Sequence, residues 1–182
     1  MPTETFDGEP LYVEGQTPDD AEITRRRSTW FEPYHAALGD QIARLRRGGP
    51  IVLYDAHSIR SIMPRLFDGE LPVFNIGDNG GMTCDLALTR AVTDVCAATR
   101  LGHIVNGRFK GGWTTRHYGR RAEGVHAIQM ELADRGYMAD PAGPVTEASW
   151  PSPYNATVAA PMREHLRSVL TACLAFARSA RS

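Results

Sequence analysis

Apolar residues recur with two different periods along this 182-residue chain, and together these periods predict helices that alternate with strands. A first helix is expected to begin at Pro33, because proline suits the first helical turn, and to end at Gly48. A second helix is expected from Asp85, a favourable N-cap, to Gly102. The last predicted helix has one apolar face, formed by Met162, Leu166, Val169, Leu170, Cys173 and Leu174.

Short apolar runs between these helices predict buried strands, at residues 51–54, 73–75, 103–106 and 125–131. Strands that alternate with helices indicate a single α/β domain over residues 1–182, with a mixed or largely parallel sheet covered on both faces. The polar, turn-rich residues 1–24 are expected to form an extended arm. Residues 107–121 and the proline-rich residues 141–153 are expected to be loops.

The overall charge is balanced, with 20 Lys and Arg against 21 Asp and Glu. This balance indicates neither nucleic acid nor a membrane surface as a partner. No stretch predicts a membrane span or a signal peptide. The three cysteines show no CxxC spacing and cannot all pair, which favours core packing in a reduced, cytoplasmic protein.

Candidate chemistry gathers where the predicted strands end, because sites in such sheets lie beyond the carboxyl ends of the strands. Three of these ends carry His57, Asn106 with Arg108, and Glu131. His57 is a candidate metal ligand, and the alternative is a buried, hydrogen-bonded histidine. Asp55 is expected to point to the other face of its strand and to act through a neighbouring layer.

Glu131 ends an otherwise apolar strand, where a buried carboxylate needs a partner. One interpretation makes Glu131 a general base that takes a proton from a metal-bound water. The other interpretation is a salt bridge to a loop arginine. Gln129 is expected to point to the same face and to assist by hydrogen bonding.

The loop that follows Asn106 is rich in glycine, arginine and aromatic residues. Its paired glycines allow close approach of backbone to a ligand, and Arg108 and Arg116 are suited to clamping carboxylates. Arg60 adds positive charge near the same rim. An ordinary solvated loop is the alternative.

Taken together, these segments resemble the N-formylglutamate amidohydrolases, also called N-formylglutamate deformylases. The resemblance covers most of the chain as far as Met138. It is carried by TFDGEPLY (5–12), RRSTWFEPYHAAL (26–38), YDAHSIRSIMPRLFDGELPVFNIG (54–77), NGRFKGGWTTRHYG (106–119) and GVHAIQMELADRGYM (124–138).

The resemblance implies a three-layer α/β sandwich with a mixed, mostly parallel sheet, similar to zinc carboxypeptidases (phosphorylase/hydrolase-like). It implies that His57, in an HS pair, binds a divalent metal, zinc, and that Glu131, in an EL pair, does acid–base work. Members of the family begin with a further strand and a PHSG-type histidine motif that should supply other metal ligands. The chain is therefore expected to be an N-terminally truncated member.

The activity implied is hydrolysis of N-formyl-L-glutamate to formate and L-glutamate, a late step of histidine breakdown. Arg108, Arg116 and Arg60 are then expected to bind the two substrate carboxylates. Asn106 or His117 is expected to hydrogen-bond the tetrahedral oxyanion. An exposed sheet edge favours a homodimer. The alternatives are a metallo-amidohydrolase acting on another N-acyl amino acid or acidic peptide, and an inactive, truncated binding module.

Overall fold

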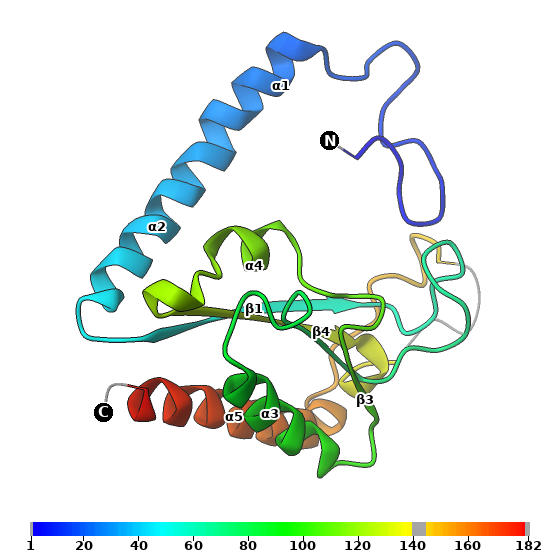
Figure 1. The fold of residues 1–182 in the computed structure, drawn as a ribbon. Helices are drawn as coiled ribbons and strands as arrows, with labels where there is room; N and C mark the ends of the chain where they lie inside the picture. Colours follow the sequence, from blue (N-terminus) through cyan, green and yellow to red (C-terminus); the bar gives the residue numbers. More distant parts are fainter. Residues whose placement is uncertain (1, 140–144, 181–182) are drawn as a thin grey trace.

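The computed structural model of the chain describes residues 2–139 and 145–180. The fold is mixed α/β, as the sequence predicts (Figure 1). Its elements are, in chain order, α1 (Asp20–Arg26), the π-helical turn η1 (Arg27–Phe31), α2 (Glu32–Arg46), β1 (Ile51–Ile59), β2 (Phe74–Gly77), α3 (Leu86–Ala97), β3 (His103–Val105), α4 (Trp113–Tyr118), the 3₁₀ turn η2 (Arg121–Glu123), β4 (Val125–Ala133), the 3₁₀ turn η3 (Asp134–Gly136) and α5 (Ala156–Ser179).

The four strands form one sheet in the order β1-β4-β2-β3. Strand β1 is parallel to β4 and β2 is parallel to β3, while β2 is antiparallel to β4. The expected mixed, mostly parallel sheet is confirmed. The three predicted strand ends were expected to meet at one edge of the sheet, and this expectation is wrong for β3. Because β2 is antiparallel to β4, β2 and β3 run in the direction opposite to β1 and β4. Asn106, which follows β3, therefore leaves the sheet in the direction opposite to His57 and Glu131.

Helices lie on both faces of the sheet (Figure 1). Helices α3 and α5 cover one face, where alternate residues of β2 and β4, among them Phe74 and Ile128, join the main hydrophobic core. The expected core role of the cysteines is confirmed, because all three are buried free thiols. The other face, beneath α2 and α4, has a smaller apolar cluster around Ile42 and Val125. Beyond this cluster the second face becomes polar, and the candidate site lies there.

The helix predicted from Pro33 is confirmed as α2, which begins at Glu32 with Pro33 in its first turn. A further helix, α1, begins thirteen residues before Pro33. Asp19 caps it by accepting a hydrogen bond from the backbone N–H of Glu22, so the helix begins within the range expected as an arm. Pro33 is the second residue of α2 in a continuous helical segment that runs to Arg46, and the π-helical turn ends two residues before this proline. Proline has no N–H to donate, and a π-helical turn is one way in which a helix accommodates such a break.

Strand β1 extends to Ile59 and β4 to Ala133, beyond the predicted ends. Polar residues near these ends suggested that the strands stopped, whereas parallel pairing continues through them. The residues of helix α4 were predicted to form part of a loop.

Of the prolines in the predicted 141–153 loop, Pro141 and Pro144 lie outside the described residues, and the other two precede α5. None of the helices in the described ranges has the length and apolar character needed to cross a membrane.

A buried carboxylate holds the turn between β2 and α3. Asp78 accepts hydrogen bonds from Thr89 Oγ1 (2.6 Å), Asn106 Nδ2 (2.6 Å) and the Gly81 N–H (2.8 Å). Burial by itself would raise the pKa of Asp78, but the three hydrogen bonds outweigh burial and hold the pKa below its ordinary value of 3.8. The ionised carboxylate therefore stabilises the fold. This contribution is complete above pH 3.8 and is lost as the pH falls through the lower folded-state pKa.

Replacing Asp78 by asparagine should lower the free energy of unfolding by about 2 kcal/mol near neutral pH, because three donors lose a charged acceptor. The difference from the unmodified chain should shrink when urea unfolding is repeated at pH values below 3.8, because the carboxylate of the unfolded chain then protonates before that of the folded chain. Asp68→Asn, at an exposed position, is the matched control and should change little. An equal loss at both pH values would contradict the proposed role of the charge.

Candidate active site

Polar side chains occupy alternate positions of three neighbouring strands on one face of the sheet. The parallel register sets Asp55 opposite Gln129 and His57 opposite Glu131. The antiparallel register sets Asn75 opposite Glu131 on the other side of β4. Since alternate residues of a strand share a face, these five side chains project from the same surface. This is the candidate site.

Glu131 lies in the centre of the group and is only 7% exposed. Its Oε2 accepts a hydrogen bond from Gln129 Nε2 at 3.1 Å, which confirms the expected assistance by Gln129. Burial is the main cause that raises the pKa of Glu131, and the nearby Asp55 adds to it, while His57 and Gln129 act in the opposite direction. Within the described residues Glu131 forms no salt bridge, so the salt-bridge interpretation is not supported. A buried carboxyl with a raised pKa is suited to accepting a proton.

His57 is held by Asp55, whose Oδ1 lies 2.9 Å from His57 Nε2. The other oxygen of Asp55 accepts a hydrogen bond from Thr115 Oγ1 at 2.8 Å. The expectation that Asp55 and His57 point to opposite faces is wrong, because residues two apart in a strand share a face. His57 is about half exposed, whereas Asp55 is mostly covered. The two successive hydrogen bonds that join Thr115 to Asp55 and Asp55 to His57 therefore orient an accessible imidazole.

The glycine-rich loop crosses this face and closes one side of the site. Its Gly112 N–H donates to Gln129 Oε1 at 2.6 Å, and Asn79 N–H donates to Lys110 O at 2.7 Å. A Cβ at Gly77 would lie 2.6 Å from the backbone nitrogen of Gly111, so the strand and the loop can approach this closely only without a side chain there. The loop backbone was expected to approach a ligand closely; in the structure it closely approaches the sheet.

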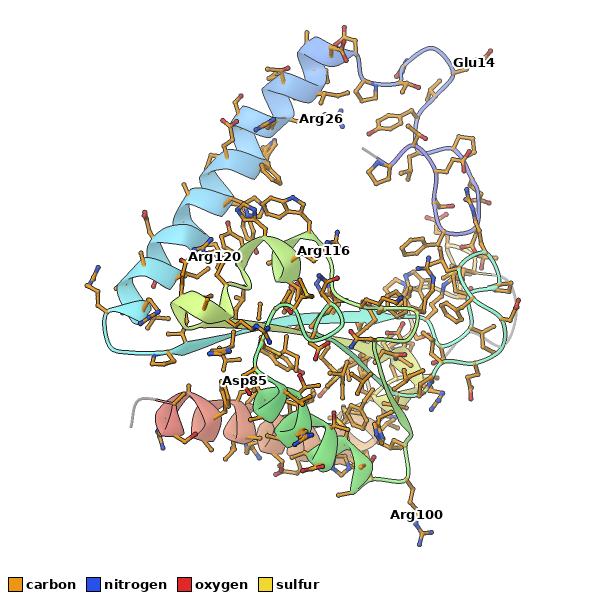
Figure 2. All side chains as sticks on the ribbon, viewed as in Figure 1. Glu14, Arg26, Asp85, Arg100, Arg116 and Arg120 are labelled. Atoms are coloured by element: carbon orange, nitrogen blue, oxygen red, sulfur yellow. The ribbon has the colours of Figure 1, made fainter. Side chains whose placement is uncertain are left out.

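Two of the predicted arginines belong to this loop and α4. Arg108 Nε donates to Leu66 O at 2.8 Å, and Arg116 Nη1 donates to Gly111 O. Figure 2 shows Arg116 on α4, on the polar side of the sheet. Both residues are exposed, and neither forms a salt bridge within the part of the chain that the structure describes. Their charges are thus available to an anionic ligand.

Arg60 differs from these two arginines. Its Nη2 donates to both carboxylate oxygens of Asp7, at 2.8 and 2.7 Å, and its side chain is 17% exposed. It lines a separate pocket with Ser58 and residues of the N-terminal arm. The structure therefore does not bring Arg60 together with Arg108 and Arg116.

Asn106 and His117, the two residues expected to bind the oxyanion, differ in whether their side chains are free to contact a ligand. Asn106 has a positive φ of 53°, and its amide is engaged with Asp78 and with the N–H groups of Asp78 and Gly80. It therefore supports the turn beside the site. His117 is exposed on α4 and stacks on Trp113, with ring centroids 4.1 Å apart.

Asn75 and Thr115 also contact this group of polar side chains, and neither was predicted as a site residue. Asn75 is 1% exposed and donates to Glu131 O and Pro72 O, but its Oδ1 has no hydrogen-bond partner among the described residues. An unpaired buried acceptor next to Glu131 is the kind of group that a bound water or ligand would satisfy. The signal available in the sequence was a single polar residue within the apolar run Val73–Ile76.

The described residues provide one well-oriented ligand for a divalent metal. A histidine that binds a metal commonly donates its second ring N–H to a carboxylate, and the Asp55–His57 pair has this form. A catalytic metal needs about three protein ligands. Within the described ranges, no group of three or more His, Cys, Asp or Glu is placed to hold a metal. These residues alone therefore do not fit a resident catalytic metal.

Several known proteins are similar to this chain. The family model for N-formylglutamate amidohydrolase matches residues 1–138. An N-formylglutamate deformylase of Pseudomonas aeruginosa is 45% identical over 97% of this chain, and one of Pseudomonas putida is 44% identical over 96%. The crystal structure of an N-formylglutamate amidohydrolase from Ralstonia eutropha superposes with a TM-score of 0.73 at 25% identity, covering 95% of this chain.

This chain spans slightly less than two thirds of these relatives. The aligned parts make up 64% and 63% of the Pseudomonas proteins and 58% of the Ralstonia chain. The family match covers the strands and the loop that form the candidate site. The chain belongs to the N-formylglutamate amidohydrolase family.

Proposed function

We propose that this chain carries part of an enzyme that hydrolyses N-formyl-L-glutamate to formate and L-glutamate, a reaction of histidine degradation. The observation that carries the proposal is the buried Glu131, set opposite His57 by the β1–β4 register. Its family relatives are named as deformylases of the same compound. We also propose a zinc-carboxypeptidase-like version of the fold, with a cytoplasmic location that the three unpaired cysteines support.

In this proposal Glu131 is the general base. It accepts a proton from water while the water oxygen bonds to the formyl carbon. The C–N bond then breaks, and the proton passes from Glu131 to the departing amine nitrogen, which yields formate and glutamate. Gln129 holds the Glu131 carboxylate in place. Asn75, with its free buried oxygen beside Glu131, is placed to position the water.

Charge complementarity supports an acidic substrate. Arg108 and Arg116 have no carboxylate partner within the described residues, and arginine is suited to binding carboxylates. We propose that these two bind the substrate carboxylates and that His117 donates to the oxyanion. Arg60 would join them only by releasing Asp7, and Asn106 would act by positioning the turn rather than by binding. We propose a divalent metal, zinc, as the cofactor, with His57 as its one ligand among the described residues.

A second candidate function is binding of acidic N-acyl amino acids without turnover. It is favoured by the missing set of three metal ligands within the described ranges. Metal content of the purified chain, formate release and calorimetric binding of N-formylglutamate separate the two. Bound metal with formate release supports the deformylase, whereas binding without metal or formate supports the second candidate.

Glu131→Gln should lower kcat for formate release by about 100-fold to 10,000-fold, because the amide cannot accept the proton from water. KM should change little, since the side chain keeps its size and its neighbour Gln129. Steady-state kinetics on N-formylglutamate measure both values. Glu164→Gln, an exposed position on α5, is the matched control and should leave both unchanged. An unaltered kcat in Glu131→Gln would exclude Glu131 as the general base.

The pH profile should reflect the raised pKa of Glu131. Only the ionised carboxylate accepts a proton, so kcat should fall as the pH drops through this pKa. Because burial raises the pKa, the midpoint of this acidic limb should lie above the ordinary value of 4.5. Rates measured in overlapping buffers provide the test, with stability followed in parallel by circular dichroism. A midpoint below 4.5 in the folded protein would contradict the proposal.

Arg116→Gln should raise KM for N-formylglutamate about tenfold, which corresponds to the loss of about 1.4 kcal/mol of carboxylate binding. The effect should be smaller with N-formylglutamine, which lacks the side-chain carboxylate, if Arg116 binds that group. Arg120→Gln removes an exposed arginine that already pairs with Glu123 and is the control. Equal KM values for Arg116→Gln and the unmodified chain on both substrates would exclude Arg116 from substrate binding.

A further inference from the structure

The first turn of α4, residues 112–115, contacts both strands that carry the candidate site. Figure 1 shows α4 over β1 and β4, on the face opposite α3 and α5. The Gly112 N–H donates to Gln129 Oε1 on β4 at 2.6 Å. Thr115 Oγ1 donates to Asp55 Oδ2 on β1 at 2.8 Å. A single helical turn thus holds one polar side chain on each of the two strands.

The contact from Gly112 decides which end of the Gln129 amide faces Glu131. A side-chain amide accepts at its oxygen and donates at its nitrogen, and half a turn of rotation exchanges the two ends. Since a backbone N–H can only donate, the oxygen of Gln129 must point toward α4. Its Nε2 is then left to donate to Glu131 Oε2, at 3.1 Å. Both side chains are buried, so solvent does not compete for these bonds.

The contact from Thr115 acts in the same way on His57. The buried Thr115 hydroxyl donates to one oxygen of Asp55, and the other oxygen lies 2.9 Å from His57 Nε2. An ionised carboxylate only accepts hydrogen bonds, so Nε2 carries the ring hydrogen and Nδ1 of the neutral imidazole has none. The contact therefore sets both the direction of the ring and its tautomer.

The turn is held in place by contacts that do not involve these side chains. Asn79 N–H donates to Lys110 O at 2.7 Å, which ties the preceding loop to the turn after β2. A Cβ at Gly77 would lie 2.6 Å from Gly111 N, and a Cβ at Gly111 would lie 3.1 Å from the methyl carbon of Thr115. Gly111 also has a φ of 115°, which favours glycine. The loop, the turn and β2 are thus packed together as one unit.

We propose that Gly112 and Thr115 are positioning residues for the two ionisable members of the candidate site. Gly112 acts on Glu131 through the amide of Gln129. Thr115 acts on His57 through the intervening carboxylate of β1. One backbone N–H and one hydroxyl, three residues apart, therefore set the direction of the proton-accepting carboxylate and of the imidazole together.

The same turn continues into Arg116, which is proposed to bind a substrate carboxylate. The Arg116 N–H donates to Gly112 O at 3.1 Å, and its Nη1 donates to Gly111 O. A ligand that moves Arg116 would therefore move the residues that orient the site. This catalytic consequence rests on the proposed function, whereas the orientation itself rests on the hydrogen bonds.

Thr115→Val removes the hydroxyl and keeps the shape, whereas Thr115→Ser keeps the hydroxyl. On N-formylglutamate, Thr115→Val should lower kcat about tenfold and change KM less than about twofold, because misorientation acts mainly on the transition state. Thr115→Ser should recover most of the loss. The control is Thr171→Val, which removes an exposed hydroxyl that donates to Arg167 O on α5. Equal kcat values for the valine and serine variants at position 115, or a change in KM alone, would overturn the role of Thr115.

Gly112→Pro and Gly112→Ala test the other contact. The φ of Gly112 is −76°, which proline adopts, and proline removes the N–H. Alanine keeps the N–H, and its Cβ would meet Gln129 Oε1 at 3.5 Å, an ordinary contact. Proline should lower kcat about tenfold, whereas alanine should retain most of it. Gln129→Met removes both ends of the amide and should act like proline, which keeps the test decisive if Gly112→Pro does not fold. Unchanged kcat in Gln129→Met would overturn the role of this contact.

Nitrogen-15 NMR of the imidazole reads the orientation without substrate or added metal. Above the ordinary histidine pKa of about 6.5, His57 should show a protonated Nε2 and an unprotonated Nδ1 in the unmodified chain. Thr115→Val should show exchange between the two tautomers, and Thr115→Ser should keep the single form. A protonated Nδ1 in the unmodified chain, or the same His57 spectrum in Thr115→Val, would overturn the proposal.

Formate release and the spectra separate the two proposals. An unmodified chain that has the expected tautomer but releases no formate with any added divalent metal supports the positioning and counts against the proposed function. Formate release with His57 spectra that are the same in every variant supports the proposed function and overturns the positioning.

Discussion

The parallel pairing of β1 with β4 is the constraint on which the candidate site depends. Parallel strands send their carboxyl ends the same way, so this single pairing brings together residues 74 positions apart, His57 and Glu131. It also sorts the side chains by face, with the apolar set packed beneath α3 and α5 and the polar set left facing α4. A slip of one residue in this register would bury the polar set and expose the core.

The antiparallel pairing of β2 with β4 is the second feature that shapes the candidate site. Because β2 runs against β4, the turn after β2 and the loop after β3 lie beside the middle of β4 rather than beyond its end. Asp78 and Asn106 hold this turn together, and the glycine contact between Gly77 and Gly111 lets the loop lie directly on the sheet. The loop then reaches Gln129 through a backbone N–H, and Thr115 reaches Asp55. This network positions the loop and α4, which carry Arg108 and Arg116.

The site and the sheet are open in the same region. His57 is oriented by Asp55 as a metal ligand would be, yet the described residues supply no set of three. Strand β1, which carries His57, is also the strand whose outer edge pairs with no other strand among residues 2–139 and 145–180, and an apolar groove lies beside it.

The sequence by itself determined the family, the α/β alternation, the core role of the cysteines, and the presence of the polar residues His57 and Glu131 near the ends of two strands. These follow from local patterns, because periodicity and motif are properties of neighbouring residues. Only the tertiary structure decided the direction of β3, the engagement of Arg60 by Asp7, and the place of Asn75 beside Glu131. Each of these depends on which strand or segment lies alongside another, and contacts between residues far apart in the chain leave no trace in local periodicity.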